Sequence, residues 1–430
     1  MKNQFKSLDE WLNWQQDLHP KNIDFKIERI KSVYNKLNIH KIAKKTIIVA
    51  GTNGKGSTVA ILESLLHESN YKVGSFTSPH ILKYNERIKI SKQNIDDESL
   101  LEAFKIIDDA RGDTTLTYFE FATLAAFYIF SKQDLDYALL EVGLGGRLDA
   151  TNIIDSDLSI ITSIGIDHTE FLGSSIDSIA NEKAGVMRSS CYSIFAGSNP
   201  PATLLSNAQT NNVTFVFGQK HFSHNIYSDH WKWRGKNGAQ IKLPLLPLTG
   251  DFQYNHASAA LQAIEFIEPG ILKNEPSLSA GLRNVSLMGR YQKCSKYPEV
   301  IIDVAHNEDS AIKLFDNLNK EDKKKTYAVI GLLNDKDAYT LIKPLAPIIE
   351  KWFVGTVDST RGMNSSEIKE RVRSLVGDDK IICYENMNNA FEAAYEALYF
   401  NDRLIVYGSF YTVSEFMSYQ RHAEKKSLNE

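Results

Sequence analysis

The chain has 430 residues, 43% of them hydrophobic, and 49 Lys and Arg against 53 Asp and Glu, so its net charge of −4 excludes the strongly basic surface of a nucleic-acid-binding or membrane-surface protein. Three distant cysteines, Cys191, Cys294 and Cys383, form no Cys-x-x-Cys pair, which argues against both a disulfide framework and a zinc site. No apolar run approaches a membrane span, and we expect a cytoplasmic enzyme of about two or three domains.

The first half of the sequence alternates apolar runs typical of strands with segments of helical periodicity. The strand candidates are residues 46–50, 72–77, 137–142, 158–164 and 191–196. Residues 96–111 and 118–132, between the second and third runs, have the spacing of helices. This alternation predicts an α/β domain with a parallel sheet of the phosphate-loop ATPase type.

The second half contains a change of pattern and then a second α/β region. Short polar and aromatic runs within residues 213–248 predict a peripheral β-rich insertion. Apolar strand-like runs then resume at residues 299–307, 326–333, 348–355, 380–385 and 403–409. They predict a smaller, Rossmann-like C-terminal α/β domain. Because residues 292–298 are polar and lack periodicity, we interpret them as the linker between a domain at 1–292 and a domain at 293–430.

The stretch IIVAGTNGKGS, residues 47–57, leads from an apolar run into a glycine-rich loop. It departs from the strict phosphate-loop pattern, because Val49 stands at the first glycine position and Gly56 separates Lys55 from Ser57. A strand precedes the loop and a helical pattern follows it. The context therefore favours an unusual nucleotide-binding loop over a plain strand-to-helix turn.

The residues of this loop have the properties that phosphate binding requires. Gly51, Gly54 and Gly56 permit positive φ angles and a close approach of backbone N–H groups to an anion. Lys55 adds a positive charge, and the hydroxyl of Ser57 is a candidate ligand for Mg²⁺. The N-terminus of the following helix would point its positive dipole end at the phosphates.

Polar side chains follow three further predicted strands. Ser78 and His80 follow the second strand, Glu141 ends the third, and Asp167 with His168 follows the fourth. Ligands of open α/β sheets bind at such strand ends, and a strand-end carboxylate meets Mg²⁺ in phosphate-loop enzymes. We favour a place for His168 near the metal, with Asp167 as its partner. A turn cap at Ser78, a solvated carboxylate at Glu141 and a structural histidine remain alternatives.

Two other segments carry glycines or charges with less specific meaning. GLGGRLDATN, residues 143–152, lacks the third glycine and the following helix of a Rossmann dinucleotide motif. Lys183 lies on an amphipathic helix, where residue chemistry alone predicts an exposed side chain.

In the second half, Asn255, Asp303 and His306 stand near turns. Arg290 is either a phosphate clamp or an interdomain salt-bridge partner.

Taken together, these segments resemble the folylpolyglutamate synthase/dihydrofolate synthase family of the Mur ligase superfamily. The motifs that match in order and spacing are GTNGKGS, SPHILKYNERI, EVGLGGRLDATN, DHTEFLG, EKAG, GRYQ, DVAHN and GSFYTVSE. The resemblance covers nearly the whole chain. Two mild departures, GDFQYNHASA and Tyr291 in place of the more common Phe, concern the adenine-side contacts.

The resemblance implies a two-step ligation in which ATP phosphorylates a substrate carboxylate and the amine of L-glutamate then displaces phosphate. It implies ATP and Mg²⁺ as cofactors, with two metal sites, and dihydropteroate, reduced folates and L-glutamate as small-molecule partners of a monomer. A folylpolyglutamate synthase alone, a Mur-type ligase for another carboxylate, a phosphate-loop kinase or ATPase and a non-enzymatic nucleotide-binding module are the alternatives.

The resemblance also assigns roles to residues around the nucleotide. Lys55, Lys183 and His168 are the implied catalytic residues, with Lys183 carbamylated to steady a second metal. Ser78, Glu141 and His168 are the implied metal ligands. The implied nucleotide-binding residues are Thr52, Asn53, Gly54, Lys55, Gly56, Ser57, Asn255, Arg290, Asp303 and His306.

A pterin pocket is the last implication. In bifunctional members a similar N-terminal stretch borders the pterin, here a helix bearing Trp11 and Trp14 and the loop after it. The implied substrate-binding residues are Asp17, Leu18, His19, Thr117, Tyr118, Phe119, Glu120 and Asp149. Aromatic faces would stack on the pterin ring and Glu120 would bind its amino edge. Alternatively, Tyr118 and Phe119 are core residues and Glu120 favours a helix N-terminus.

Overall fold

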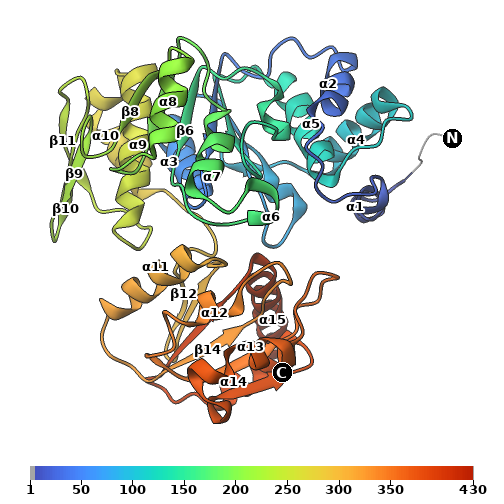
Figure 1. Cartoon of the computed structure of the whole chain (residues 1–430), viewed down its shortest axis with the longest axis vertical. Helices are drawn as coiled ribbons and strands as arrows, with labels where there is room; N and C mark the ends of the chain where they lie inside the picture. Colours follow the sequence, from blue (N-terminus) through green and yellow to red (C-terminus); the bar gives the residue numbers. More distant parts are fainter. Residues whose placement is uncertain (1–4, 430) are drawn as a thin grey trace. The chain divides into compact units, whose positions relative to one another are not determined.

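The computed structural model describes residues 5–429, with side chains through residue 423. The chain forms two compact units, coloured blue to yellow and orange to red in Figure 1. The N-terminal unit contains the residues up to His80, Tyr84–Pro247 and Asp251–Ser286. The C-terminal unit contains Ile81–Lys83, Leu248–Gly250 and the residues from Leu287 onward.

The N-terminal unit is built on an eight-stranded sheet within the described residues, with the order β4-β3-β2-β5-β1-β6-β7-β8. The strands β2, β5, β1, β6, β7 and β8 are parallel to one another. At the β2 edge, β3 pairs antiparallel with β2, and β4 pairs antiparallel with β3. The strands are β1 (Lys45–Ala50), β2 (Val73–Phe76), β3 (Ile88–Ile90), β4 (Gln93–Asn94), β5 (Tyr137–Glu141), β6 (Leu158–Ile161), β7 (Tyr192–Phe195) and β8 (Thr214–Phe217).

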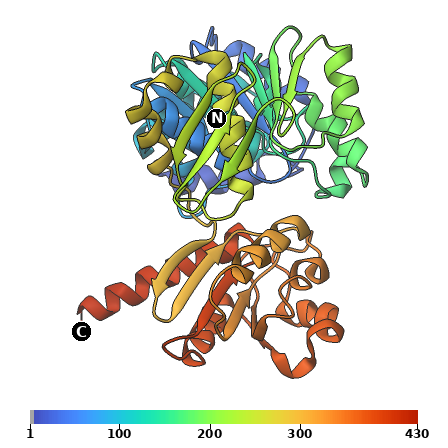
Figure 2. The ribbon, with the colours of Figure 1, turned by 90° about the vertical axis from the view of Figure 1, so that its left-hand side faces the viewer.

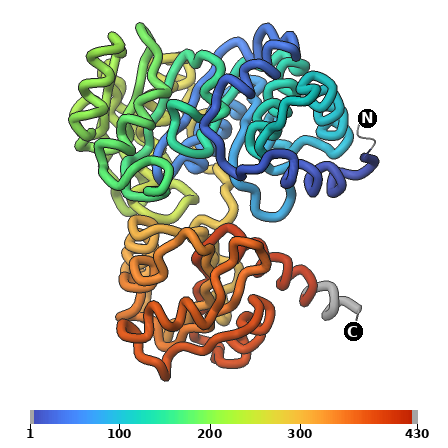
Figure 3. The backbone as a smooth tube through the Cα atoms, turned by 45° about the vertical axis from the view of Figure 1, so that its right-hand side comes forward, coloured from blue at the N-terminus to red at the C-terminus, as the bar shows by residue number. Residues whose placement is uncertain are grey.

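Helices cover both faces of this sheet because successive residues of a buried parallel strand point to opposite sides. Ile48 and Ala50 of β1 join one core cluster with residues of α5 and α7, while α3 packs with α9 and α10. The first two helices lie beside α4 and α5, as the tube in Figure 3 shows. The helices are α1 (Leu8–Asp17), α2 (Ile27–Lys36), α3 (Lys55–His67), α4 (Asp97–Arg111), α5 (Tyr118–Ser131), α6 (Thr169–Leu172), α7 (Ile176–Ala184), α8 (Ala202–Thr210), α9 (Phe252–Ile267) and α10 (Glu275–Arg283). Shorter 3₁₀ turns are η1 (Tyr84–Arg87), η2 (Ala150–Ile153) and η3 (Ile271–Lys273).

The predicted β-rich insertion is smaller than residues 213–248. A separate antiparallel sheet of β9 (Ser223–Ile226), β10 (His230–Arg234) and β11 (Gln240–Pro244) lies in front of the main sheet in Figure 2. β8, which we assigned to the insertion, instead pairs in parallel with β7. Its assignment was wrong because an edge strand is half exposed and therefore mixes polar and aromatic residues.

The C-terminal unit holds a six-stranded sheet in the described residues, with the order β12-β13-β17-β14-β15-β16. Only β12 is antiparallel to its neighbour. Trp352 is fully buried in its core. The strands are β12 (Gln292–Lys296), β13 (Glu299–Asp303), β14 (Thr326–Ile330), β15 (Ile349–Gly355), β16 (Ile381–Tyr384) and β17 (Arg403–Tyr407). The helices are α11 (Glu308–Asn319), α12 (Ala338–Ile342), α13 (Ser365–Val376), η4 (Asp378–Lys380), α14 (Met387–Glu396) and α15 (Phe410–Asn429).

The mixed α/β architecture confirms the predicted fold class, but the interpretation of residues 292–298 as a linker was wrong. These residues form β12 and the turn into β13. An edge strand with one exposed face has few apolar residues, so it reads as a polar loop. Because the compact C-terminal unit already includes Leu287, we propose that the domains divide near residue 286 rather than after residue 292.

Candidate active site

The glycine-rich loop turns sharply between β1 and α3. Gly54 has a φ of 87°, a left-handed conformation that favours glycine, and Lys55 after it begins α3. A Cβ on Gly54 would lie 2.1 Å from Nε2 of His256 on α9, so a larger residue does not fit. No side chain caps the N-terminus of α3, which leaves the positive end of the helix dipole to an anion.

The same loop is fixed to the end of β6 by hydrogen bonds. The backbone N–H of Thr52 donates to the carbonyl of Ser163 at 2.9 Å, and its hydroxyl lies 3.1 Å from the carbonyl of Gly165. The N–H of Asn53 donates to the hydroxyl of Ser163 at 3.0 Å, and its carbonyl accepts from Thr162 Oγ1 at 2.6 Å. Thr52 and Asn53 therefore hold the shape of the loop before any ligand binds.

Lys55 is folded back onto its own loop. Its Nζ donates to the carbonyl oxygens of Gly51 at 3.0 Å and Thr52 at 3.1 Å. A phosphate oxygen is a stronger partner for an ammonium group than a carbonyl, so Lys55 is placed to change partners when phosphate enters. Ser57 is buried in the first turn of α3, on the same helix end.

The predicted metal ligands follow strands that neighbour β1. Val49 of β1 is paired with Glu141 of β5, and β2 and β6 lie beyond these two strands. Since parallel strands end at one edge, Ser78, Glu141 and His168 all follow strand ends at the edge that carries the glycine loop. Glu141 accepts a hydrogen bond from the Ser78 N–H at 3.2 Å, and its Oε2 would lie 3.5 Å from a Cβ on Gly56.

His168 lies in the segment after β6, directly before α6. Its backbone has a φ of 49° and its ring is one third exposed, with Nε2 3.9 Å from Oδ1 of Asp167. Within the described residues no three His, Cys, Asp or Glu side chains gather as a ready metal site. The oxygens of Glu141 and Ser78 fit Mg²⁺, which takes few protein ligands and completes its octahedron with phosphate oxygens and water.

Lys183 is buried, with 3% of its surface exposed, so the expectation of an exposed side chain was wrong. The loop of residues 143–152 covers it, because a Cβ on Gly146 would lie 3.1 Å from the Lys183 Cα. Burial and, to a smaller extent, the charge of Lys55 lower the pKa of Lys183 to about 7, although Asp167 and Asp149 oppose both effects. A substantial fraction of the Lys183 side chains therefore carries a neutral amine near neutral pH.

Asp149 organises the same loop from within. Its carboxylate accepts from the N–H of Leu144 at 2.9 Å, the N–H of Thr151 at 2.9 Å and the Thr151 hydroxyl at 2.6 Å. Burial raises the pKa of Asp149. These bonds already use much of the hydrogen-bond acceptor capacity of the carboxylate. The conformation of the loop therefore accounts for the position of Asp149 without a substrate contact.

The two predicted pterin-pocket segments meet through a cluster of charged side chains. His19 lies 2.7 Å from Thr115 Oγ1 and 3.2 Å from Asp24 Oδ2. Arg29 of α2 binds Asp24 at 2.9 Å and Glu120 at 2.8 Å. Glu120 also accepts from the Thr117 N–H at 2.7 Å, which closes a capping box at the start of α5.

The aromatic residues at the start of α5 are half buried. Phe119 packs on Gly143, where a Cβ would lie 2.6 Å from its ring, and its centroid is 5.8 Å from that of Phe76. Tyr118 meets Tyr84 edge to face at 5.7 Å. Both rings thus belong partly to the core, and Leu18 is also half buried while Asp17 is exposed at the end of α1.

The C-terminal unit groups its predicted residues around the end of β13. Asp303 accepts from the backbone N–H groups of Tyr291 at 2.8 Å and Ala305 at 2.7 Å, and burial raises its pKa. Arg290 lies over the ring of Phe410 at 5.2 Å, and the centroid of His306 is 6.1 Å from the same ring. Asn255, on α9, belongs to the N-terminal unit.

Comparison with known proteins identifies this architecture. The chain matches the Mur ligase middle domain over residues 49–264 and the Mur ligase glutamate ligase domain over residues 289–410. It is 37% identical over 435 residues to the dihydrofolate synthase/folylpolyglutamate synthase of Haemophilus influenzae, covering 95% of this chain and 96% of that one. The chain belongs to the dihydrofolate synthase/folylpolyglutamate synthase family of Mur ligases.

Solved members of this family have the same fold. E. coli FolC in complex with DHPP and ADP is 34% identical with a TM-score of 0.90, covering 97% of this chain and 99% of that chain. A bifunctional folylpolyglutamate synthase/dihydrofolate synthase with Mn, AMPPNP and L-glutamate bound gives the same identity and TM-score, covering 98% and 100%. In the described part of our chain, no helix combines the length and apolar character needed to cross a bilayer.

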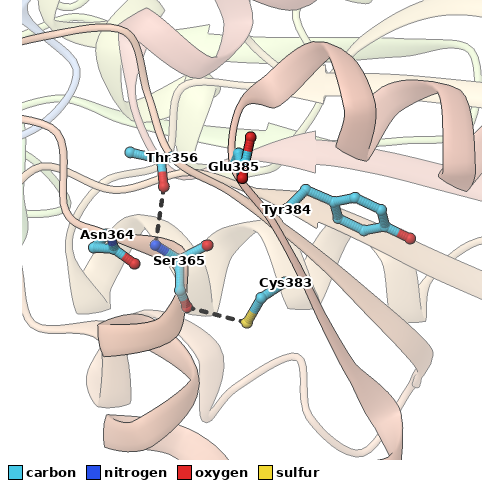
Figure 4. Close-up of a pocket in the computed structure, with 6 residues that line it drawn as sticks. All are labelled: Thr356, Asn364, Ser365, Cys383, Tyr384 and Glu385. Carbon is cyan, nitrogen blue, oxygen red and sulfur yellow. Dashed lines mark hydrogen bonds between the residues drawn. The ribbon is translucent and has the colours of Figure 1, made fainter.

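A pocket of about 350 Å³ lies elsewhere, at the ends of β15 and β16 and the start of α13 (Figure 4). Its lining residues are Thr356, Asn364, Ser365, Cys383, Tyr384 and Glu385. The Ser365 N–H donates to Thr356 Oγ1 at 3.1 Å, and the Cys383 thiol donates to the Ser365 carbonyl at 3.3 Å. Burial raises the pKa of Cys383, so the thiol is unsuited to nucleophilic chemistry. None of the residues implied by the family resemblance lines this pocket.

Sequence reasoning missed Arg29, Asp24 and His256. Arg29 stands on a short amphipathic helix and its partner Glu120 is 91 residues away, so no local pattern announces the pair. His256 follows Asn255 within a helical run, and only the packing of α9 on the loop reveals its place. A buried histidine beside a glycine loop is a signal that becomes visible in three dimensions alone.

Proposed function

We propose that this protein is an ATP-dependent ligase that joins L-glutamate to dihydropteroate, forming dihydrofolate, and to reduced folates, forming folylpolyglutamates. The observation that carries the proposal is the glycine loop with Lys55 at the N-terminus of α3, beside the carboxylate of Glu141. FolC of E. coli, which shares this fold, was solved with DHPP and ADP. Another relative was solved with L-glutamate.

Phosphoryl transfer to the acceptor carboxylate is the first step of the proposed reaction. The carboxylate oxygen attacks the γ-phosphorus, the bond to the β–γ bridging oxygen breaks, and ADP leaves. Lys55 exchanges its bonds to the Gly51 and Thr52 carbonyls for phosphate oxygens. The loop N–H groups and the α3 dipole stabilise the same charge without reorganisation.

Mg²⁺ supplies neutralisation of the negative charge on the phosphates when it is bound. Ser78, Glu141 and His168 are the residues that would hold it. The Ser78 N–H fixes the orientation of the Glu141 carboxylate through its 3.2 Å hydrogen bond. Nucleotide contacts are proposed for Thr52, Asn53, Gly54, Gly56, Ser57, Asn255, Arg290, Asp303 and His306.

In the second step, the amine of L-glutamate attacks the acyl carbonyl, phosphate leaves with the bonding electrons, and the nitrogen loses a proton to give the amide. The amine must be positioned more than activated, because an acyl phosphate is already reactive. Half-buried Tyr118 and Phe119 are suited to hold a flat pterin against the start of α5. Glu120 is committed to Arg29 and Thr117, so we propose that it orders the pocket wall.

Lys183 is proposed to be carbamylated. Its buried neutral amine would attack CO₂, forming an N–C bond and releasing a proton, and the resulting anion would face the charge of Lys55. An intact mass that exceeds the sequence mass by the mass of CO₂ would support this modification. We also propose that the protein is a cytoplasmic monomer. Light scattering, which measures the molar mass in solution, tests the monomeric state.

A glutamate-dependent ADP-release assay tests the function directly. The purified protein is supplied with ATP, Mg²⁺ and either dihydropteroate or tetrahydrofolate, with and without L-glutamate. Product formation with both acceptors supports the bifunctional ligase. Activity with tetrahydrofolate alone reduces the protein to a folylpolyglutamate synthase, and ADP release that needs neither acceptor nor glutamate indicates a simple ATPase.

A further inference from the structure

Arg87 is an arginine buried without an acidic partner. It ends η1 and has 8% of its surface exposed. Its Nε donates to Nδ1 of His80 at 2.8 Å, and its guanidinium carbon lies 5.4 Å from the ring centroids of both Tyr84 and Tyr118. In the part of the chain that the structure describes, no carboxylate lies within ion-pair distance of this guanidinium. A buried charge without a counter-charge is costly, so its retention needs an explanation.

Other well-buried arginines of this chain have carboxylate partners. Arg29 binds Asp24 and Glu120, and Arg111 binds Asp108 at 2.7 Å. Arg403 binds Glu299 and Glu321. Arg111 also lies over an aromatic ring, that of Trp14, so an aromatic neighbour does not replace the carboxylate in this protein. Arg87 therefore differs from these arginines in lacking a carboxylate partner, and a bound anion would supply that negative charge.

The surroundings of Arg87 favour an anion over a cation. His80 accepts from Arg87 through Nδ1, so in this arrangement its proton is on Nε2, which makes the ring a donor on its other side. The hydroxyl of Tyr84 is buried and has no hydrogen-bond partner in the structure. Guanidinium N–H groups, an imidazole N–H and a phenol thus stand together, and all of them are donors.

The position of this cluster indicates which anion it would receive. His80 is two residues after Ser78, whose N–H binds Glu141 at the phosphate end of the site. Tyr118, whose ring centroid lies 5.4 Å from the Arg87 guanidinium carbon, is the first residue of α5 and belongs to the proposed pterin wall. A ligand group bound to Arg87 would therefore lie between the phosphate end of the site and the proposed pterin wall. The acceptor molecule must span the same interval, because its carboxylate meets ATP while its pterin meets α5.

We propose that Arg87, held by His80, binds a carboxylate of the acceptor substrate. This inference rests on the proposed ligase function. Arginine suits the task because its planar fork binds a carboxylate through two parallel hydrogen bonds. Two acceptor carboxylates have this chemistry. One is the carboxylate that becomes phosphorylated, present in both acceptors, and the other is the α-carboxylate of the glutamyl group, which dihydropteroate lacks.

Steady-state kinetics of Arg87→Met, with Arg111→Met as the matched control, test the proposal. The wild-type enzyme is measured first, with dihydropteroate, tetrahydrofolate and L-glutamate varied in turn. For Arg87→Met we expect the KM of at least one acceptor to rise roughly 10- to 100-fold, with the KM of ATP unchanged. A rise for both acceptors assigns the reacting carboxylate, and a rise for tetrahydrofolate alone assigns the α-carboxylate.

Thermal unfolding separates a binding arginine from a structural one. Removing an unpartnered buried charge should leave the Tm of Arg87→Met equal to or above that of the wild type. Arg111→Met, which strands Asp108, should unfold at a lower temperature and keep its acceptor KM values within about twofold. If Arg87→Met does not fold, Arg87→Lys takes its place, because lysine keeps the charge but loses the fork, and its acceptor KM should still rise.

Three results would overturn the inference while leaving the ligase function intact. These are unchanged acceptor KM values in a folded Arg87 variant, a rise confined to the KM of L-glutamate, and a Tm loss as large as that of Arg111→Met without a kinetic effect. A wild-type protein that releases no ADP in response to acceptor and glutamate would instead contradict the proposed function itself.

Discussion

Two clusters of charged side chains in the N-terminal unit are built in opposite ways. At the start of α5, Arg29 is neutralised by Asp24 and Glu120, and Glu120 closes a capping box as well. At the glycine loop, Lys55 donates to the carbonyl oxygens of Gly51 and Thr52, and its charge lowers the pKa of buried Lys183. The first cluster is complete without a ligand. We propose that the phosphates of the nucleotide neutralise the second cluster, which would make the first a wall of the site and the second its reaction centre.

Lys55→Ala should give the largest effect, because it removes the cation that we propose lies nearest to the transferred phosphoryl group. We expect glutamate-dependent ADP release to fall about 10³-fold, with an unchanged Tm. Lys44→Ala is the control, since Lys44 is exposed and binds only Asp136 at the surface. Near-normal turnover of Lys55→Ala would contradict the assignment of this loop to phosphate.

Arg29→Met tests the complete cluster. It leaves two carboxylates in a partly buried place without their cation, so the free energy of unfolding should fall by about 3 kcal/mol in urea titrations. Arg147→Met breaks an exposed pair with Glu182 and should cost less than about 1 kcal/mol. Equal losses in the two variants would show that the Arg29 cluster is not the rigid wall described above.

Glu141→Gln probes the proposed metal site. Replacing a carboxylate by an amide weakens binding of a divalent cation, so the Mg²⁺ concentration for half-maximal activity should rise roughly tenfold. His168→Ala should lower turnover. Glu170→Gln changes an exposed carboxylate on α6 and serves as the control. Identical Mg²⁺ titrations of Glu141→Gln and the wild type would remove Glu141 from the metal site.

Lys183 gives the smallest effect and the one that depends on pH. Its pKa falls from 10.5 to about 7 on folding, so between these values the unfolded chain binds more protons. Stability contributed by the neutral amine therefore rises with pH across this window and is lost as the pH falls toward 7. In CO₂-free buffer, Lys183→Met should raise the Tm at about pH 7 by roughly 2–6 °C and flatten its rise toward about pH 9.5. The same pH profile in variant and wild type would contradict the burial of the amine.

The sequence predicted what local patterns encode. Apolar runs located the strands. Since ligands of parallel sheets bind at strand ends, the same pattern led to the proposal of Ser78, Glu141 and His168 as metal ligands. The glycine spacing located the turn between β1 and α3, which is the proposed phosphate loop. Edge strands β8 and β12 were misread, because partial exposure removes the apolar signal that marks a buried strand.

Long-range packing explains what remained hidden. Lys183 lies on a nine-residue helix whose periodicity does not reveal that residues 143–152 cover it. The Arg29–Glu120 pair and the isolation of Arg87 depend on which segments meet, and a single sequence does not state this. The places of polar residues at strand ends were thus predictable, while the contacts between charged residues of distant segments were not.

The distribution of tryptophans gives each unit its own optical reporter. Trp352 is the only tryptophan in the C-terminal unit, fully buried with Tyr407 at 6.3 Å, while Trp11, Trp14, Trp231 and Trp233 belong to the N-terminal unit. Replacing Trp352 by Phe would leave an emission spectrum that reports the N-terminal unit alone. The difference from the wild-type spectrum then isolates the C-terminal unit, so that denaturation of the two halves can be followed separately in one intact chain.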